Sequence, residues 1–259
     1  MRIATWNVNS MRARIDRVQA WLERSDVDVV ALQETKCKDD QFPTSVFENL
    51  GYEVAHFGHS QWNGVAILSR VGLADVQAGF DGMPLWGEPA AAEARALSAT
   101  CGGVRIWSLY VPNGRTLEDP HLATSCSAER SAGRRPGVAR GRPGRSDRLV
   151  GDWNVAPLDE DVWSMAAFEG STHVSAPERA AFNAVVDAGF ADVVRPHTPG
   201  AFTYWDYQRL RFPKKEGMRI DFVLGSPALA ARVKGASIDR EERKGKGASD
   251  HAPVIVDLT

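Results

Sequence analysis

The sequence is poor in cysteine and has no long apolar run. Its three cysteines, Cys37, Cys101 and Cys126, are odd in number and widely spaced among 259 residues. That spacing matches neither a metal finger nor a disulfide framework, so we expect a reducing, cytoplasmic setting. No apolar run approaches the roughly 18 residues of a membrane helix. The start of the chain also lacks the basic and apolar regions of a signal peptide. We therefore expect no membrane partner.

An excess of positive charge is also missing. The formal net charge is −2, which is unusual for a protein that binds nucleic acid through overall charge. A local basic rim around a cation held by carboxylates would still allow such binding. Hydrophobic residues make up 43% of the chain, enough for a sizeable core. We predict a single domain over residues 1–259.

Short apolar runs recur along the chain and predict buried strands. They are Ile3–Trp6, Val27–Leu32, Val65–Leu68, Val104–Val111, Leu149–Val150, Ile220–Leu224 and Pro253–Leu258. Helical patterns lie between some of them: at Arg12–Arg24, after Pro43, after the capping box Ser175–Glu178, and from Ser226 through Val233. The alternation is not a regular βαβ repeat. It predicts an α/β fold of packed sheets flanked by helices.

A short echo links the two halves of the chain. Trp6-Asn7-Val8 and Trp153-Asn154-Val155 both follow apolar runs. A duplicated half-domain would produce this echo, and so would coincidence in a chain rich in tryptophan. The sequence leaves both explanations open.

Polar residues recur where the apolar runs end, which is where folds present reactive groups. They are Asn7, Glu34, Tyr110, Asp152, Asn154, Asp221, Asp250 and His251. Carboxylate and amide oxygens suit Mg²⁺, and soft ligands for zinc are missing. Taken singly, each residue has an ordinary structural reading as a turn, a cap or a buried hydroxyl. The recurrence at six strand-like runs favours a site.

The neighbours Asp250 and His251 point to opposite faces if the segment is extended. A catalytic histidine usually needs a carboxylate on its second nitrogen. We therefore predict that Asp221 orients His251, and that Asp250 faces a metal.

Seven motifs in order resemble the exonuclease III family of the endonuclease/exonuclease/phosphatase superfamily. They are Trp6-Asn7-Val8-Asn9, Leu32-Gln33-Glu34-Thr35-Lys36, Asn63-Gly64-Val65-Ala66-Ile67, Tyr110-Val111-Pro112-Asn113-Gly114, Gly151-Asp152-Trp153-Asn154, Arg219-Ile220-Asp221 and Ser249-Asp250-His251-Ala252-Pro253. The resemblance runs from Met1 to Leu258, apart from Leu122–Arg148. It implies a four-layered α/β sandwich, with two mostly antiparallel sheets packed face to face and helices outside.

The resemblance also implies a Mg²⁺-dependent DNA phosphodiesterase, with Mn²⁺ as a substitute metal. One ion would be held chiefly by Glu34; the candidate ligands are Asn7, Glu34, Asp152, Asn154, Asp250 and His251. Tyr110 would contact the scissile phosphate, Asp152 would activate the attacking water, and Asn154 would orient water or phosphate. His251, oriented by Asp221, would stabilise the transition state. These groups act where negative charge grows during attack.

Weaker patterns concern DNA itself. Trp205 lies in an aromatic loop that is followed by Lys214 and Lys215, a combination that suits stacking and phosphate contacts. The alternative is a core tryptophan beside a solvated basic turn. In the resembling family, a tryptophan at this place lines the pocket for an extruded abasic sugar. Further candidates for gripping the backbone are Arg12, Lys36, Asn113 and Arg115. The expected partner is double-stranded DNA with abasic sites or 3′ ends, bound by a monomer.

Two other functions stay open. One is a related phosphodiesterase that acts on phospholipid or inositol phosphate, although no apolar membrane hairpin or phosphoinositide-binding cluster is evident. The other is a DNA-binding copy with impaired catalysis.

The composition of Leu122–Arg148 differs from that of the rest of the chain. This stretch holds seven arginines, two acids, two prolines and four glycines, a composition that opposes a helix. The resembling family has a long amphipathic helix and an apolar strand here, and the strand shrinks to Leu149-Val150. We favour two compensating frame errors in the coding sequence, since GC-rich codons in a wrong frame yield such residues. A genuine basic, disordered DNA-binding loop is the alternative.

Overall fold

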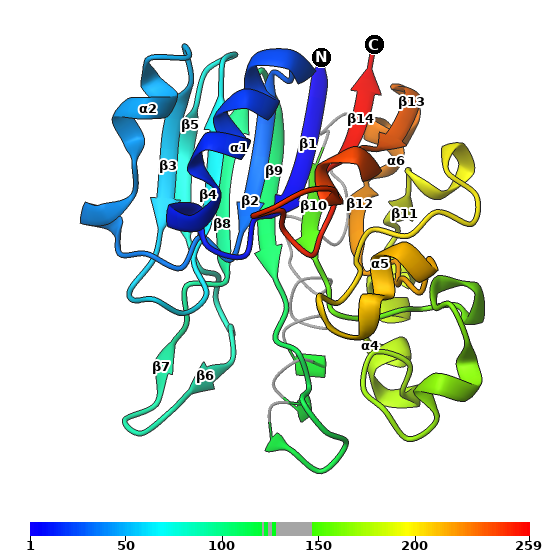
Figure 1. Cartoon of the computed structure of the whole chain (residues 1–259). Coiled ribbons are helices and arrows are strands. Elements are labelled where there is room, and N and C mark those ends of the chain that lie inside the picture. Colours follow the sequence, from blue (N-terminus) through cyan, green and yellow to red (C-terminus); the bar gives the residue numbers. More distant parts are fainter. Residues whose placement is uncertain (121, 124–125, 128–146) are drawn as a thin grey trace.

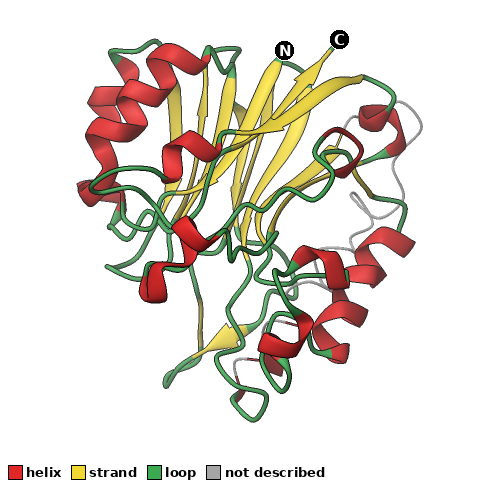
Figure 2. Ribbon diagram, turned by 45° about the vertical axis from the view of Figure 1, so that its right-hand side comes forward, coloured by secondary structure: helices red, strands yellow, loops and turns green. Residues whose placement is uncertain are grey.

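The protein is built on two six-stranded β-sheets packed face to face (Figures 1 and 2). A computed structural model describes residues 1–120, 122–123, 126–127 and 147–259. The first sheet has the order β13-β14-β1-β2-β4-β3, and its strands are Val233–Ile238, Val254–Leu258, Arg2–Asn7, Val29–Gln33, Val65–Ser69 and Glu53–Phe57. The second has the order β11-β12-β10-β9-β8-β5, and its strands are Ala191–Asp192, Asp221–Gly225, Asp147–Asp152, Val104–Tyr110, Ala96–Cys101 and Ala74–Ala78. A two-stranded hairpin of β6 (Leu85–Trp86) and β7 (Ala91–Ala92) projects beyond them.

Both sheets use the same pattern of strand directions. Each has one parallel pair, β1 with β2 and β9 with β10, and its other pairs are antiparallel. The predicted mostly antiparallel sandwich is therefore confirmed. Trp6-Asn7 ends β1, the first strand of its parallel pair, whereas Trp153-Asn154 follows β10, the second strand of its parallel pair. The two segments therefore do not hold equivalent places, and a duplicated half-domain and coincidence both stay open.

The helices that the structure describes are α1 Met11–Ser25, α2 Thr44–Glu48, α4 Ala176–Asp187, α5 Arg211–Lys214 and α6 Pro227–Ala230. The first two pack on the outer face of the first sheet, and α4 packs on that of the second. Single 3-10 turns lie at Asp39–Gln41, Asp159–Asp161, Met165–Phe168, Arg195–His197, Gln208–Leu210 and Arg240–Arg243. In the ranges that the structure describes, no helix is long and apolar enough to cross a membrane.

The core has three layers of contact. Side chains from both sheets, such as Ile3, Val150 and Val256, fill the space between them. Outside the first sheet, Val18 and Leu22 of α1 pack onto it, because their spacing of four places them on one helix face. Outside the second sheet, α4 packs through a similar apolar stripe. Helix, sheet, sheet and helix give the four layers that were predicted.

Each predicted apolar run overlaps a strand, but two predicted bounds were wrong. The strand before Asp152 was expected to shrink to Leu149-Val150, yet β10 has six residues paired to β9 and β12. Backbone hydrogen bonds to two flanking strands hold it, whatever its side chains. The helix after Ser226 ends at Ala230, and Val233 begins β13 instead. Most of Leu122–Arg148, including the predicted loss of a helix, lies outside the described residues.

Candidate active site

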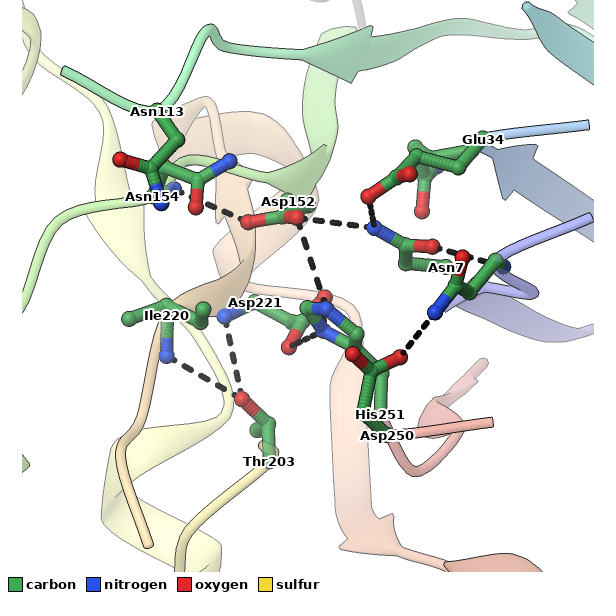
Figure 3. Close-up of polar contacts among 12 residues, drawn as sticks. Asn7, Glu34, Asn113, Asp152, Asn154, Thr203, Ile220, Asp221, Asp250 and His251 are labelled. Carbon is green, nitrogen blue, oxygen red and sulfur yellow. Dashed lines mark hydrogen bonds and ion pairs between the residues drawn. The ribbon is translucent and has the colours of Figure 1, made fainter. Parts of the chain in front are cut away.

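Polar residues that the sequence predicts meet at one edge of the sandwich, and Figure 3 labels Asn7, Glu34, Asp152 and Asp221 among them. Asn7 ends β1 and Glu34 follows β2, so the parallel pair places them side by side. Tyr110 and Asp152 end the parallel strands β9 and β10 and are register partners. Asp221 begins β12, which is antiparallel to β10, and pairs with Asp152 in register. Strand direction therefore gathers residues far apart in the sequence.

Gly151 fixes the position of Asp152. Its φ is +143°, and a Cβ built there would lie 1.9 Å from the carbonyl oxygen of Leu109. Only glycine fits this close approach to β9. Asp152 then points to the sheet edge, where its carboxylate accepts hydrogen bonds from Asn7 Nδ2 and from the backbone N–H of Asn154, both at 2.9 Å.

Glu34, Asp152 and His251 form a compact group whose candidate ligand atoms lie within 4.8 Å of one another. His251 Nε2 is 3.7 Å from Asp152 Oδ2. Its Nδ1 lies 2.9 Å from Asp221 Oδ2, the pairing that the sequence predicts. Thr203 holds that aspartate in place, since its Oγ1 accepts the backbone N–H of Asp221. The aspartate thereby orients the imidazole toward Asp152.

The buried charges of this group strongly affect one another. Burial raises the pKa of Asp152, His251 opposes the rise and the carboxylates of Asp221 and Glu34 add to it, so that the pKa is about 8. Burial opposes a charge on His251, but Asp221 and then Asp152 outweigh it and raise its pKa to about 10. Burial also disfavours a charged Glu34, yet Lys36 and Asn7 lower its pKa. The group therefore favours a cationic histidine between carboxylates.

The donor set fits a hard divalent cation. Two carboxylates, Glu34 and Asp152, converge beside His251, and carboxylate oxygens are ligands that such a cation prefers. Asn7 turns its amide nitrogen toward Glu34 and Asp152, while its oxygen accepts the N–H of Asn9. In this arrangement Asn7 orients the two carboxylates rather than offering an oxygen to a metal.

Asp250 lies beside the compact group but is not one of its members. Its Oδ1 accepts a hydrogen bond from Asn9 Nδ2 at 3.0 Å (Figure 3). A metal-ligand role for Asp250 stays a prediction, as it does for Asn154. Tyr110 faces Glu34, and burial raises the pKa of its phenol well above the ordinary value. The phenol therefore stays protonated and available as a hydrogen-bond donor.

Sequence reasoning missed His173. Its Nδ1 lies 2.7 Å from the carbonyl oxygen of Asn154, and its Nε2 lies 3.3 Å from Asn113 Nδ2. Asn154 also donates from Nδ2 to the carbonyl of Val111 at 2.9 Å. His173 thus braces the loop that carries Asn154. A lone histidine in a polar loop follows no apolar run, so no sequence pattern indicated it.

Residues 4–251 match the Endonuclease/Exonuclease/phosphatase family. The chain belongs to this family. It is 29% identical to exodeoxyribonuclease III of Haemophilus influenzae, over 98% of both chains. Its structure resembles that of a 3′-5′ exonuclease (NExo) from Neisseria meningitidis, with 35% identity, a TM-score of 0.88 and coverage of 100% and 99% of the two chains.

Two further solved structures cover the whole chain. One is a 3′ phosphatase NExo from Neisseria bound to a product DNA hairpin, with 34% identity, a TM-score of 0.87 and 99% of that chain covered. The other is an AP endonuclease from Archaeoglobus fulgidus, with 29% identity, a TM-score of 0.88 and 99% of that chain covered.

The predicted DNA contacts of this family member divide into two groups. The side chains that the structure leaves exposed are Arg12, Asn113, Arg115, Lys214 and Lys215. Lys36 instead lies in the site, where its ammonium is 2.7 Å from Glu34 Oε2. Lys36 therefore neutralises Glu34 in this state of the protein.

Trp205 is buried in this structure, and its role in binding DNA stays a prediction. Its side chain is buried, with 2% exposure, and its ring packs edge-on against Phe212 at 5.2 Å. Arg240 lies over the same ring, and the Trp205 carbonyl accepts two hydrogen bonds from Arg243. These contacts favour the alternative of a core tryptophan. Its backbone N–H still reaches the Asp250 carbonyl, so the ring anchors a loop beside the site.

Proposed function

We propose that this chain is a Mg²⁺-dependent DNA phosphodiesterase of the exonuclease III type that acts mainly at the 3′ ends of double-stranded DNA. The observation that carries the proposal is the convergence of Glu34, Asp152 and His251, with Asp221 behind the histidine. Hydrolysis of a phosphate ester needs a base for water and positive charge near the phosphoryl oxygens. This group offers both.

The proposed roles follow from the contacts. Asp152 takes the proton of the attacking water, a task that its raised pKa suits. His251, kept protonated by Asp221, donates to a phosphoryl oxygen. Tyr110 contacts the phosphate or leaving group, and Asn154 orients water. A bound Mg²⁺, held by Glu34 with its neighbours, would supply a Lewis acid for the charge that develops.

The preference for 3′ ends is supported by the relatives. The Neisseria structures are described as a 3′-5′ exonuclease and a 3′ phosphatase, at 35% and 34% identity. The AP endonuclease from Archaeoglobus is 29% identical, and it supports incision at abasic sites as a second activity. We also propose that the protein works as a cytoplasmic monomer, since one chain supplies the whole group and Cys37, Cys101 and Cys126 are free thiols.

Three labelled DNA duplexes test the proposal: one with a recessed 3′ end, one with a 3′-phosphate and one with an internal synthetic abasic site. Each is incubated with Mg²⁺, with Mn²⁺ and with a chelator, and Asp152→Asn serves as the inactive control. We expect metal-dependent release of nucleotides or phosphate from 3′ ends, and slower abasic incision. Abasic incision faster than release from 3′ ends would show that abasic sites, and not 3′ ends, are the main substrate. Cleavage of phospholipid or inositol phosphate, with all three duplexes intact, would replace the proposal by the related phosphodiesterase.

A further inference from the structure

The turn that carries Glu34 has an unusual backbone. Glu34 and Lys36 both adopt left-handed conformations, with φ of +51° and +53°. Residues other than glycine hold such angles only where their surroundings fix them. Two backbone hydrogen bonds help to fix the conformation of this turn. The Thr35 N–H donates to the carbonyl of Gly64, and the Lys36 N–H donates to the carbonyl of Asn63.

The side chain of Thr35 leads away from the active site into a second set of contacts. Its Oγ1 lies 2.8 Å from His56 Nε2, and His56 Nδ1 lies 2.8 Å from Asp39 Oδ1. The same aspartate oxygen accepts the N–H of Gly58 at 2.8 Å. Because a carboxylate only accepts, His56 carries its proton on Nδ1. Its Nε2 therefore accepts a hydrogen bond from the Thr35 hydroxyl.

Packing holds these groups in one arrangement. Thr35 is fully buried, and the His56 ring stacks on Phe42 with a centroid distance of 4.2 Å. A Cβ built at Gly64, whose φ is +91°, would lie 2.2 Å from Thr35 Oγ1. Glycine at this place keeps the space that the hydroxyl needs. A fixed imidazole thus sets the direction of a fixed hydroxyl, one residue beyond Glu34.

A nucleophilic role for the neighbouring thiol does not fit. Cys37 Sγ is 3.9 Å from His56 Nε2, which suggests a cysteine–histidine–aspartate arrangement. Burial raises the pKa of Cys37, so its reactive thiolate is disfavoured. Its side chain is buried, and the shorter contact of Nε2 is to Thr35. His56 therefore orients the hydroxyl of Thr35 and does not activate the thiol of Cys37.

We propose that Thr35, His56 and Asp39 form a positioning relay that sets the orientation of the Glu34 carboxylate for the divalent cation. The proposal rests on the metal centre of the proposed function. None of the three residues belongs to the compact group around the cation site; they act through the turn between β2 and the 3-10 turn at Asp39. Partners that orient a metal ligand typically change metal affinity by about 10–100-fold when they are removed.

Direct binding of Mn²⁺ to the whole chain, without DNA, tests the relay. The matched pair is Thr35→Val, which removes the hydroxyl at nearly constant shape, and Thr35→Ser, which keeps it. We expect Thr35→Val and His56→Ala to weaken Mn²⁺ binding by about 10–100-fold, measured by titration calorimetry or by loss of the free-ion paramagnetic resonance signal. Thr35→Ser should bind Mn²⁺ like the unchanged chain. At saturating metal, Thr35→Val should regain most of its DNA cleavage, so the metal requirement changes more than kcat.

The outcomes separate the relay from the proposed function. Equal Mn²⁺ binding by Thr35→Val and the unchanged chain overturns the relay, and so does equal loss in Thr35→Val and Thr35→Ser. Circular dichroism checks that each variant is folded, and Asp39→Asn gives an independent, exposed substitution of the same relay. If the unchanged chain binds Mn²⁺ but cleaves no DNA, the proposed function fails while the relay stands or falls on the binding data. If the unchanged chain binds no Mn²⁺, the relay is overturned.

Discussion

Replacing Arg148 by methionine is expected to stabilise the protein. Arg148 lies on β10 with 0% exposure, and its three guanidinium nitrogens have no hydrogen-bond partner among the described residues. It is two residues from Val150, and alternate residues of a strand share a face. Val150 belongs to the core between the sheets. The guanidinium is therefore placed in that core, and no carboxylate of the described part of the chain pairs with it.

The size of the effect follows from this burial. Burial lowers the pKa of Arg148 from 12.5 to about 9, and Arg232 contributes in the same direction. At about 1.36 kcal/mol per pKa unit, that change corresponds to about 5 kcal/mol of lost stability while the group is charged. Because the lowered pKa belongs to a base, the loss is complete below pH 9 and shrinks as pH rises above it. An uncompensated buried charge typically costs about 3–5 kcal/mol.

The measurement is equilibrium unfolding by denaturant, together with a thermal melt. Arg148→Met should raise the free energy of unfolding by about 3–5 kcal/mol. For a chain of this size the melting temperature should rise by roughly 6–20 °C. Arg219→Met is the matched control. Arg219 is also buried, with 2% exposure, but it is paired with Asp192 at 2.7 Å, so its replacement should destabilise the protein.

A neutral or destabilising Arg148→Met would refute this reasoning, and so would equal changes in the two variants. The same position bears on the origin of Leu122–Arg148, because Arg148 is its last residue. A frame error would leave an arginine where a core strand needs an apolar side chain. Resequencing the coding DNA tests the cause. An alternative frame that encodes no amphipathic helix would remove that explanation, and a cooperative transition with full cleavage would show that the segment is tolerated.

Four further predictions concern the site and its surroundings. Glu34→Gln should lower DNA cleavage by about 10²–10⁴-fold and abolish its response to Mg²⁺ in a metal titration; near-normal rates at saturating Mg²⁺ would exclude its role. Asp152→Asn should lose a similar factor while a gel-shift assay still shows binding of abasic DNA. Asp221→Asn should move the alkaline fall in activity to lower pH, because the carboxylate raises the pKa of His251 to about 10 and the protonated form is retained only below it; an unmoved pH profile would contradict the pairing. Trp205→Ala should lower the free energy of unfolding by about 3–5 kcal/mol and reduce cleavage of abasic and intact duplexes in parallel, whereas a selective loss on abasic DNA would restore the stacking role.

The sequence predicted the central strands because these strands are buried on both faces. Val65–Ser69 is buried along its whole length and reads as a continuous apolar run. The edge strand Ala74–Ala78 is exposed at every residue and carries no such run. Ala96–Cys101 is mostly buried, but its small and polar side chains hide its periodicity. Strands of these two kinds depend on hydrogen bonds to a neighbour, which no local pattern records.

The sequence could predict those residues of the site that stand at the end of an apolar run. Glu34 and Asp152 do so, and strand direction then brings them together. His173 and His56 lie outside such positions, and their contacts depend on how distant loops pack. Trp205 is an aromatic beside basic residues in the sequence, and neither its burial nor its packing against Phe212 is recorded by that local pattern.

The two halves of the sandwich each hold only part of the cation site. Glu34 follows a strand of the first sheet and Asp152 ends a strand of the second. A cation bound to both would act as a cross-link between the sheets, adding about 2.7 kcal/mol of stability at a hundred times its dissociation constant. Any slip of one sheet against the other would part the two carboxylates. The affinity for the cation is therefore also a measure of how firmly the two sheets are held in register.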